Sequence, residues 1–375
     1  MKDTIARRRL LGAEVYDQSE QGTQISVRSV ARMRPPLTVY GHSKQDGTPS
    51  PENPVPIVSA GDSGEIGVTV QGGNLFDKST ITPNKYVSDT SGNLNDSKTE
   101  TLSASDYINV AGMSFIFATM MENGNWMAFY DSEKTYISGN TGIGYGVPIA
   151  VPENAKYARV TVKNDSLDIF MLNAGSTALP YEPYKQPQTL TIQTPGGLPG
   201  IPVTSGGNYT DESGQQWVCD EIDYKRGKYV QRVKCARLSG DIYDTEISFG
   251  RYIISVSDIF GSIPNVRYPV ITSVASTIEP ITQSIQNQIF QYGNGIYWYC
   301  TDYFSSKEEL QTFLEENDVT IIGHLAEPIE TDLPAEEIAA YKSLHMYSPT
   351  TTVSNDAGAW MKIVYQTKKS LQLAN

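Results

Sequence analysis

Apolar residues along much of this chain alternate with polar ones or gather in short runs, and Gly, Pro, Asn and Ser separate the runs. Alternation is typical of strands with one buried face, and short apolar runs between turn residues are typical of strands buried on both faces. In residues 157–162 (YARVTV), the alternation places Ala158, Val160 and Val162 on one face. The pattern therefore predicts a mostly β protein made of many short strands joined by turns.

Two pairs of apolar runs are spaced as hairpins. Residues 113–117 (MSFIF) and 126–130 (WMAFY) flank the sequence ENGN at 122–125, and an Asn-Gly pair between apolar runs is a strong hairpin signal. Residues 289–292 and 296–300 bracket Gly-Asn-Gly in the same way. We expect each pair to form neighbouring antiparallel strands.

The length of 375 residues exceeds what one core usually holds, so about two to four domains are expected. Residues 1–72 end in a proline-rich connector, 73–185 hold closely spaced strands, 186–235 contain a Pro/Gly connector and a long hairpin, and 236–375 mix strands with short helices. The strands of 73–185 predict a jelly-roll β-sandwich. The expected fold class is mostly β and multidomain, with this sandwich, long hairpins and a C-terminal α+β domain.

Helix signals occur in the C-terminal part of the chain. Ser306 and Glu309 form a capping box ahead of an apolar helix face, and Pro334 fits the first turn of a second helix. We therefore expect one or two short helices within 236–375.

The composition narrows the range of functions. The 31 Gly, 21 Pro and 23 Tyr agree with many turns and strands. Forty-two acidic residues against 29 basic ones give a net charge of −13, which argues against a nucleic-acid partner. No apolar run reaches the roughly 18 residues that a membrane-spanning helix needs, and no signal-peptide core follows the N-terminal arginines. We expect a protein made in the cytoplasm without a signal peptide and without membrane insertion.

Residue patterns that carry metal or nucleophilic chemistry are missing. The three histidines form no H-x-H or H-E-x-x-H pattern, the three cysteines form no C-x-x-C pair, and no G-x-S-x-G elbow or phosphate loop occurs. The sequence therefore predicts no metal, no cofactor and no enzymatic activity. Cys219 and Cys235 flank a predicted turn near Gly227; two reduced thiols are the favoured interpretation, and a cross-strand disulfide is the alternative.

Paired carboxylates leave one enzymatic alternative open. A glycosidase needs two acids about 5–10 Å apart, and 42 acidic residues allow a pair that no sequence pattern reveals. Asp220, Glu221 and Asp223 cluster on a predicted strand, where we interpret them as a solvent-exposed face.

Several sequence blocks resemble proteins of phage tails. Residues 46–57 (DGTPSPENPVPI) look like a signature of tail and baseplate proteins of phages that infect Gram-positive bacteria. Residues 129–131 and 151–160 are similar to carbohydrate-binding-like jelly rolls found in such proteins. Further blocks that resemble the family follow in its order: 181–203, 206–233 and 325–365.

The resemblance implies a tail-fibre or baseplate protein, a receptor-binding structural component of the virion tail of a phage or prophage. It implies attachment to other tail or baseplate proteins through residues 1–72 and presentation of the 73–185 sandwich to host cell-wall polysaccharide, without catalysis. A homotrimer is a further implication. Two alternatives stay open, namely a polysaccharide depolymerase or glycosidase that acts through an Asp/Glu pair, and a purely structural baseplate linker.

Glycan binding requires an aromatic ring that stacks on a sugar and a few side chains that form hydrogen bonds. Trp126, Tyr130, Asp131 and Tyr136 lie near the predicted turn at 122–125 and are the candidate glycan-binding residues. The competing interpretation is that aromatic residues of an alternating strand belong to the core. The two asparagines of the turn, with Asp131, could alternatively bind calcium, although without the spacing of a known calcium loop.

Overall fold

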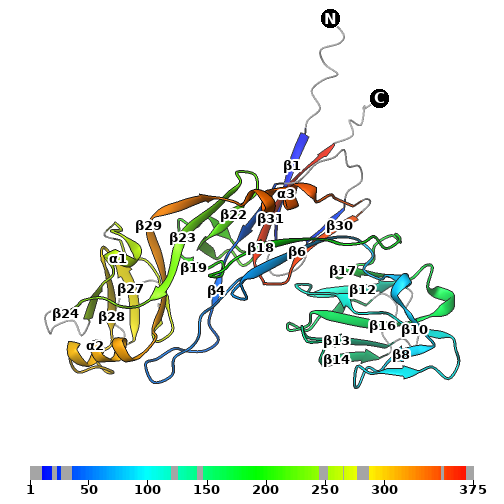
Figure 1. The fold of residues 1–375 in the computed structure, drawn as a ribbon, viewed down its shortest axis with the longest axis horizontal. Coiled ribbons are helices and arrows are strands. Elements are labelled where there is room, and N and C mark those ends of the chain that lie inside the picture. Colours follow the sequence, from blue (N-terminus) through cyan, green and yellow to red (C-terminus); the bar gives the residue numbers. More distant parts are fainter. Residues whose placement is uncertain are drawn as a thin grey trace, which may run out of the picture.

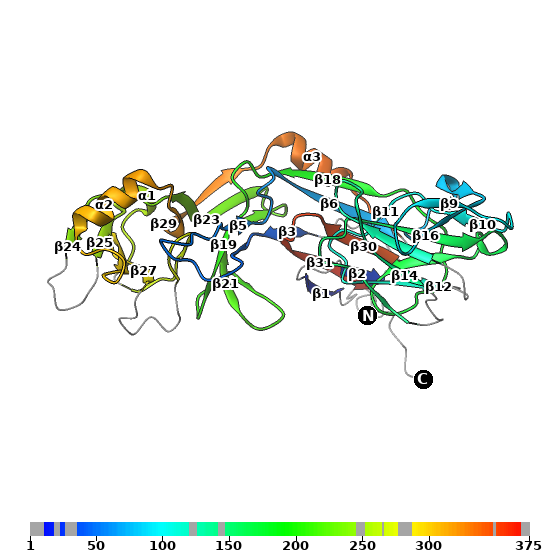
Figure 2. The same cartoon turned by 90° about the horizontal axis from the view of Figure 1, so that it is seen from below.

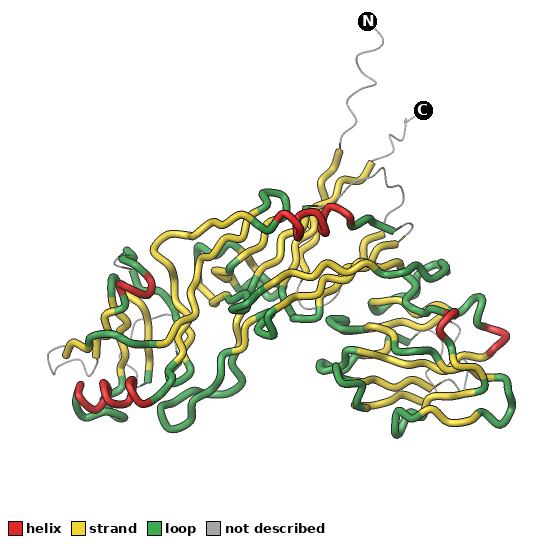
Figure 3. Tube along the Cα trace, in the orientation of Figure 1, coloured by secondary structure: helices red, strands yellow, loops and turns green. Residues whose placement is uncertain are grey.

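A central β body carries two inserted modules in the computed structural model of the chain (Figure 1). The structure describes residues 11–18, 23–26, 36–119, 126–141, 147–244, 252–264, 266–276, 287–347 and 350–368. Strands dominate these residues, and the helices are short (Figure 3). The chain is therefore a mostly β, multidomain protein, as the alternating pattern predicted. None of the helices in the described ranges has the length and apolar character needed to cross a membrane.

In the described ranges three larger sheets build the body, and their strand orders are β1-β31-β3-β22-β23-β29-β26, β18-β6-β30-β2 and β19-β21-β20. A two-stranded sheet pairs β4 (Ser43–Lys44) with β5 (Val58–Ser59). Strands from both ends of the chain and from its middle share the first sheet, so this sheet is complete only when the C-terminal strands are in place. The strands are β1 (Leu11–Gln18), β2 (Thr23–Ser26), β3 (Leu37–Tyr40), β6 (Glu65–Gly72), β18 (Gln188–Gln193), β19 (Gly200–Val203), β20 (Tyr209–Thr210), β21 (Gln216–Cys219), β22 (Glu221–Asp223), β23 (Lys228–Arg237), β26 (Ile271–Thr272), β29 (Thr320–Asp332), β30 (Thr350–Asn355) and β31 (Trp360–Lys368).

The core of the body lies between the first two sheets. Helix α3 (Ala335–Ser343) begins after Pro334 and packs Ile338 and Tyr341 against this core, as the helix signals predicted. Both sheets contribute fully buried side chains to it: Val39, Val68, Leu190 and Met361.

The first inserted module, called the sandwich (residues 73–187), separates two neighbouring strands of the body. β6 ends at Gly72 and β18 begins at Gln188, and the two strands pair antiparallel with Val70 opposite Gln188. The sandwich has a larger sheet, β14-β13-β16-β10-β7, and a smaller one, β15-β12-β17. Its strands are β7 (Thr82–Pro83), β10 (Leu102–Ala104), β11 (Ile108–Asn109, beside β16), β12 (Phe115–Thr119), β13 (Trp126–Tyr130), β14 (Tyr136–Thr141), β15 (Ile149–Ala150), β16 (Tyr157–Lys163) and β17 (Met171–Ala174).

The core of the sandwich confirms the predicted face of 157–162, because Ala158, Val160 and Val162 are 0, 0 and 1% exposed. The first predicted hairpin is wrong. β12 pairs with β15 and β17, whereas β13 pairs with β14 and β16 in the other sheet. The predicted turn at 122–125 lies outside the described residues. An Asn-Gly signal is local, whereas the sheet that a strand joins depends on partners distant in sequence.

The second inserted module, called the small module (residues 238–319), separates β23 from β29, where Arg237 lies opposite Thr320. Its sheet has the order β24-β25-β28-β27 and packs on two helices. The predicted hairpin around Gly-Asn-Gly is confirmed as β27–β28, and Ser306 caps α2 by accepting the N–H of Glu309 at 3.2 Å. The elements are β24 (Ile242–Asp244), β25 (Tyr252–Ser255), α1 (Ser257–Phe260), β27 (Gln288–Tyr292), β28 (Gly295–Tyr299) and α2 (Lys307–Glu316).

The body lies between the two modules, which gives the molecule an elongated shape (Figures 1 and 2). The predicted domain boundaries at 72, 185 and 235 stay a prediction. The strand pairings add that residues 320–332 and 350–368 belong to the sheets of the body, although they follow the small module in sequence.

A buried carboxylate lies at the base of the sandwich, between the two segments that join it to the body. Glu182, which is 2% exposed, accepts the N–H of Gly73 at 3.1 Å and pairs with Lys185 Nζ at 2.9 Å. Asn74 Nδ2 donates to the Glu182 carbonyl at 3.0 Å. A Cβ at Gly73 would lie 2.2 Å from Glu182 Oε1, so a side chain at this position would displace the carboxylate. These contacts, called the Glu182 clip, join the two segments that connect the sandwich to the body.

The proline-rich connector contacts the small module. Gln45 Nε2 donates to the carbonyl oxygens of Val55 at 3.0 Å and Thr272 at 2.8 Å. The N–H of Val55 donates to the carbonyl of Ser273 at 2.7 Å. Residues 45–55, called the strap, therefore hold the small module through backbone and amide groups.

Candidate functional site

The outward face of the larger sandwich sheet carries the predicted glycan-binding residues. Along β13, Phe129 faces the core, whereas Tyr130 faces the opposite side of the sheet. A hairpin of β8 (Lys85–Val87) and β9 (Leu94–Asp96) covers part of that side and buries Val87 completely. Only the part of the outward face that the β8–β9 hairpin leaves uncovered is therefore accessible.

Trp126 lies at one end of this face. Its half-buried ring is 5.0 Å from the ring of Tyr86, at an interplanar angle of 44°. Four residues of extended strand, roughly 13 Å, separate Trp126 from Tyr130. The structure thus places Trp126 apart from the other three predicted residues.

Tyr130 and Tyr136 support this face from within. Tyr130 is 2% exposed and donates its hydroxyl to the Gly92 carbonyl at 2.5 Å, and Tyr136 donates to the Asp89 carbonyl at 2.5 Å. Burial raises the pKa of Tyr130 to about 12. Both hydroxyls therefore fasten the loop at 89–92 to the sheet, and the Tyr130 ring offers no free face to a sugar.

Asp131 organises the neighbouring turn. Its Oδ1 accepts the N–H groups of Glu133 at 2.9 Å and Thr135 at 2.8 Å. Within this turn Lys134 has a φ of 63°, a left-handed conformation, and its Nζ lies 4.7 Å from the ring centre of Tyr107. Asp131 therefore positions Lys134 over Tyr107.

Four side chains form what we call the tyrosine–cation cluster: Tyr107, Lys134, Tyr157 and Arg159. The two tyrosine rings lie 5.9 Å apart at 73°, and Arg159 Cζ lies 4.6 Å from the ring centre of Tyr107. Arg159 is buried, and its Nε donates to the Ser105 carbonyl at 2.9 Å, whereas Lys134 is exposed and both tyrosines are half-buried. The Tyr107 ring therefore holds both cations, and the half-buried Tyr157 ring beside the exposed ammonium group of Lys134 has the apolar and donor groups that contact with a sugar requires.

Sequence reasoning missed Tyr107 and Tyr157. The signal for Tyr157 was available, because the alternation that turns Ala158 inward turns Tyr157 outward. Tyr107 gave no comparable signal. It meets Tyr157 only because β11 pairs with β16, with Ile108 opposite Ala158, and this pairing spans a long stretch of sequence.

The interpretation of Asp220, Glu221 and Asp223 as a solvent-exposed face is wrong for the first two residues. Asp220 is fully buried and Glu221 is 8% exposed. Asp220 Oδ1 accepts the N–H groups of Arg232 at 2.7 Å and Val233 at 3.0 Å, at a bulge in β23. Desolvation raises the pKa of Asp220 to about 6. A strand pattern does not reveal that a distant bulge requires a buried acceptor.

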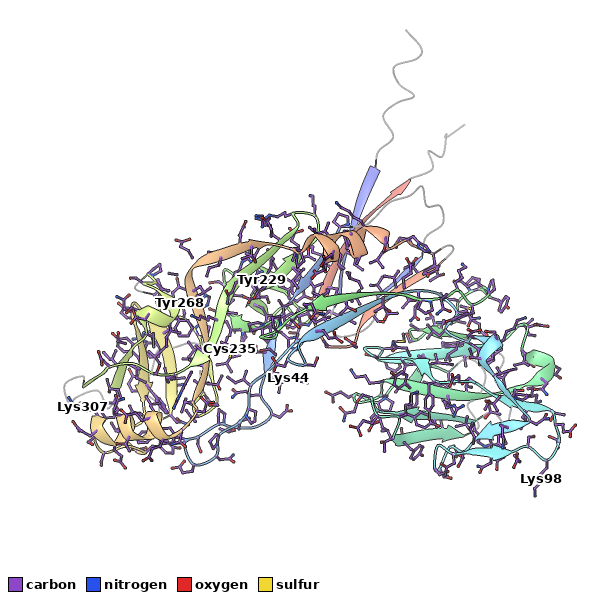
Figure 4. The ribbon with its side chains drawn as sticks, viewed as in Figure 1. Lys44, Lys98, Tyr229, Cys235, Tyr268 and Lys307 are labelled. Carbon is purple, nitrogen blue, oxygen red and sulfur yellow. The ribbon has the colours of Figure 1, made fainter. Side chains whose placement is uncertain are left out.

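Asp220 and Glu337 line the same cavity of about 410 Å³, between β18, β22, β23, β29 and α3. Tyr229, labelled in Figure 4, donates its hydroxyl to Asp220 Oδ2 at 2.6 Å, and Tyr224 donates to Glu337 Oε1 at 2.6 Å. Burial also raises the pKa of Glu337. Both carboxylates accept hydrogen bonds from the protein, and each oxygen of Asp220 has a partner.

The cysteines are free thiols. Cys219 lies opposite Gly200 and Cys235 lies opposite Ile322, in separate strand pairs, so the two thiols do not face each other. Burial raises the pKa of both thiols. In the described ranges, no three His, Cys, Asp or Glu side chains are placed to hold a metal ion. The asparagines of the calcium alternative, at 123 and 125, lie outside those ranges.

No family model, curated protein or solved structure matches this chain. The resemblance of its sequence blocks to phage tail proteins thus stays a prediction.

Proposed function

We propose that this protein is a tail-fibre or baseplate component of a phage or prophage of Gram-positive bacteria, and that its sandwich binds a host cell-wall glycan without cleaving it. The observation that carries the proposal is the insertion of the sandwich between β6 and β18. These strands pair directly with each other, and β6 also pairs with β30, so the sheet of the body is continuous without the module. A module added in this way contributes a new surface, and that surface bears the tyrosine–cation cluster.

The two ends of the described chain run together along one edge of the body. β1 pairs with β31, with Leu11 opposite Lys368 (Figure 1). One edge that holds both ends suits attachment to other tail or baseplate proteins, while the two modules extend to either side. The proposal includes a virion-tail location and a homotrimer, in which several weak sites would raise avidity by ~10² or more.

The tyrosine–cation cluster has the groups that a glycan site requires. Tyr157 supplies a ring for the apolar face of a sugar, and Lys134, held over the Tyr107 ring, supplies an exposed hydrogen-bond donor for its hydroxyl groups. Arg159 is fixed by Ser105 and holds Tyr107 in place. Binding of this kind rests on stacking and hydrogen bonds, so it should change little with salt.

The test uses the full chain and purified cell walls of the bacterium that the phage infects or that carries the prophage. Wild-type protein should sediment with the walls, and Tyr107→Ala/Tyr157→Ala should bind about tenfold more weakly, because the stacking ring of Tyr157 and the ring that holds Lys134 are both lost. Tyr181→Ala is the matched control, since Tyr181 is 49% exposed and lies outside the cluster. Equal retention of the double variant and the control would contradict the proposal.

A polysaccharide depolymerase is the second candidate. The observation that favours it is that Asp220 and Glu337, both with raised pKa values, line one cavity. Release of reducing ends from the host polysaccharide, abolished by Glu337→Gln, would establish this activity. A chain that folds but neither binds walls nor releases reducing ends would instead be a structural linker.

A further inference from the structure

The small module has a hollow of about 350 Å³ at the turn of its β27–β28 hairpin. One face of its four-stranded sheet packs Ile254, Ile296 and Trp298 into the core of the module. Ile253 and Tyr297, which lie opposite each other on β25 and β28, therefore belong to the other face, where the hollow lies. The hollow is far along the chain from the tyrosine–cation cluster and belongs to a different module.

Two tyrosine rings line this hollow nearly at right angles to each other. The rings of Tyr292 and Tyr297 are 5.7 Å apart and nearly perpendicular, at 89°. Phe290, which is 3% exposed, stacks beside Tyr297 at 5.4 Å and 11°, and the Arg267 guanidinium lies 5.1 Å from the Phe290 ring centre. Phe290 therefore fixes the Tyr297 ring, while both tyrosines remain half-buried and partly open to solvent.

Neutral polar groups complete the lining. Ser255 and Ser262 supply hydroxyl groups, and the exposed Asn294 supplies an amide. Gly295 keeps the space beside Ile253 open, because a Cβ at this position would lie 2.7 Å from Ile253 Cγ2. The hollow thus combines aromatic rings with donors and acceptors that carry no charge.

Of the described residues that line the hollow, none is charged. A charged ligand would lose water there without gaining an ion-pair partner among these lining residues, which is unfavourable. A neutral ligand with several hydroxyl groups would replace water by the serine and asparagine side chains and would stack on the tyrosines. The volume lies at the lower end of small-molecule sites, which span about 300–1,000 Å³.

We propose that this hollow is a second carbohydrate site, which takes a neutral hexose or N-acetylhexosamine unit of a longer glycan. It does not depend on the tyrosine–cation cluster. The two modules extend from opposite ends of the body (Figure 1), so one chain with both sites occupied contacts a surface polymer at two separate points. Two linked sites bind a polymer more tightly than either one alone.

The test places the full chain on a printed glycan array. The array carries neutral oligosaccharides of glucose, galactose, rhamnose, N-acetylglucosamine and N-acetylgalactosamine, and as anionic controls glycerol-phosphate chains and oligouronates. All variants contain Tyr107→Ala/Tyr157→Ala, which removes the first proposed site. In this background at least one neutral glycan should still bind, and Tyr297→Ala should weaken it about tenfold.

Matched variants separate loss of the ring from loss of the fold. Tyr297→Phe keeps the ring and should bind within about twofold of its parent, and Tyr181→Ala should bind as its parent does. Circular dichroism confirms folding of each variant. Binding to anionic glycans alone, no neutral glycan bound in the double-variant background, or binding unaffected by Tyr297→Ala would each overturn the inference. Failure of the wall-binding test with these outcomes intact would overturn only the role of the first site.

Discussion

The sandwich and the small module are both inserted between neighbouring strands of the same body, but different contacts hold them. At the base of the sandwich, one buried carboxylate, Glu182, joins both connecting segments through Gly73 and Lys185. The small module continues the long strands β23 and β29, adds β26 to their sheet, and is contacted by the strap. The attachment of the sandwich thus depends on few groups, whereas that of the small module is distributed along a strand ladder.

This difference has a consequence for function. A module whose buried attachment is one clip is loosened by a single substitution, whereas a module that shares a sheet with the body changes position only when strand pairing changes. We therefore expect single substitutions to affect the attachment of the sandwich more than that of the small module.

The largest effect is expected for Glu182→Ala. The change removes the carboxylate that accepts the Gly73 N–H and pairs with Lys185 Nζ, at a cost of about 3 kcal/mol in the free energy of unfolding. Limited proteolysis of the full chain should then cut the connecting segments at the base of the sandwich, and calorimetry should show that the sandwich unfolds earlier.

The control for this variant is Asp168→Ala on the same module. Asp168 forms an exposed ion pair with Lys78 at 2.5 Å, and such pairs contribute little to stability. If Glu182→Ala and Asp168→Ala gave the same proteolysis pattern, the clip would not hold the sandwich.

A dependence of stability on pH is expected at the base of the small module, where His324 lies. Its backbone N–H donates to Gln291 Oε1 at 3.0 Å, and its ring lies 4.6 Å from Tyr268, labelled in Figure 4. Burial lowers the pKa of His324 to about 4, below its ordinary value of 6.5. The unfolded chain therefore takes up the proton first, and stability that is present above pH 6.5 is lost as the pH falls towards 4, by about 3 kcal/mol.

His324→Gln should remove this part of the pH dependence. The quantity to measure is the difference in unfolding free energy between wild type and variant, by urea titration from pH 7 to pH 4. This difference excludes the opposite contribution of Asp220, whose raised pKa makes stability fall as the pH rises through about 6. A difference that stays constant with pH would show that His324 titrates normally.

A smaller effect is expected for Gln45→Ala in the strap. The variant loses two hydrogen bonds to backbone carbonyls, at Val55 and Thr272, with a net cost of about 1 kcal/mol because water replaces part of them. Hydrogen exchange should become faster at the Val55 N–H, which donates to Ser273, and should be unchanged at the clip. Asp46→Ala, at the exposed neighbouring position, is the control. Unchanged exchange at Val55 would mean that the strap is held without Gln45.

Local patterns predicted those parts of the fold whose partners are close in sequence. The inward face of 157–162 follows from alternation, and the β27–β28 hairpin follows from a short turn between two runs. The assignment of β12 and β13 to different sheets did not follow, because their partners β15, β16 and β17 come later in the chain. The pairing of the N-terminal strand β1 with the C-terminal strand β31 could not be predicted either, because these strands are also far apart in the sequence.

The candidate site shows the same limit at the level of side chains. Its place near the predicted turn at 122–125 singled out Tyr130, but the burial of its ring depends on the loop that its hydroxyl binds. Tyr107 belongs to the cluster only through strand pairing. The buried states of Glu182 and Asp220 depend on backbone N–H groups that distant segments bring to them.

The smallest effect on stability is expected where the sandwich contacts the body away from the clip. Lys156 Nζ donates to the Asp356 carbonyl at 2.5 Å, and Lys44 lies 3.8 Å from Glu153. These contacts are exposed, so Lys44→Ala/Lys156→Ala should change the unfolding free energy by less than about 1 kcal/mol. Small-angle X-ray scattering should nevertheless show a broader distribution of distances between sandwich and body, because fewer contacts then fix the module beside the clip. An unchanged distribution would mean that the clip alone sets the orientation of the sandwich. The attachment of the sandwich would then differ even more from that of the small module, which is distributed along a strand ladder.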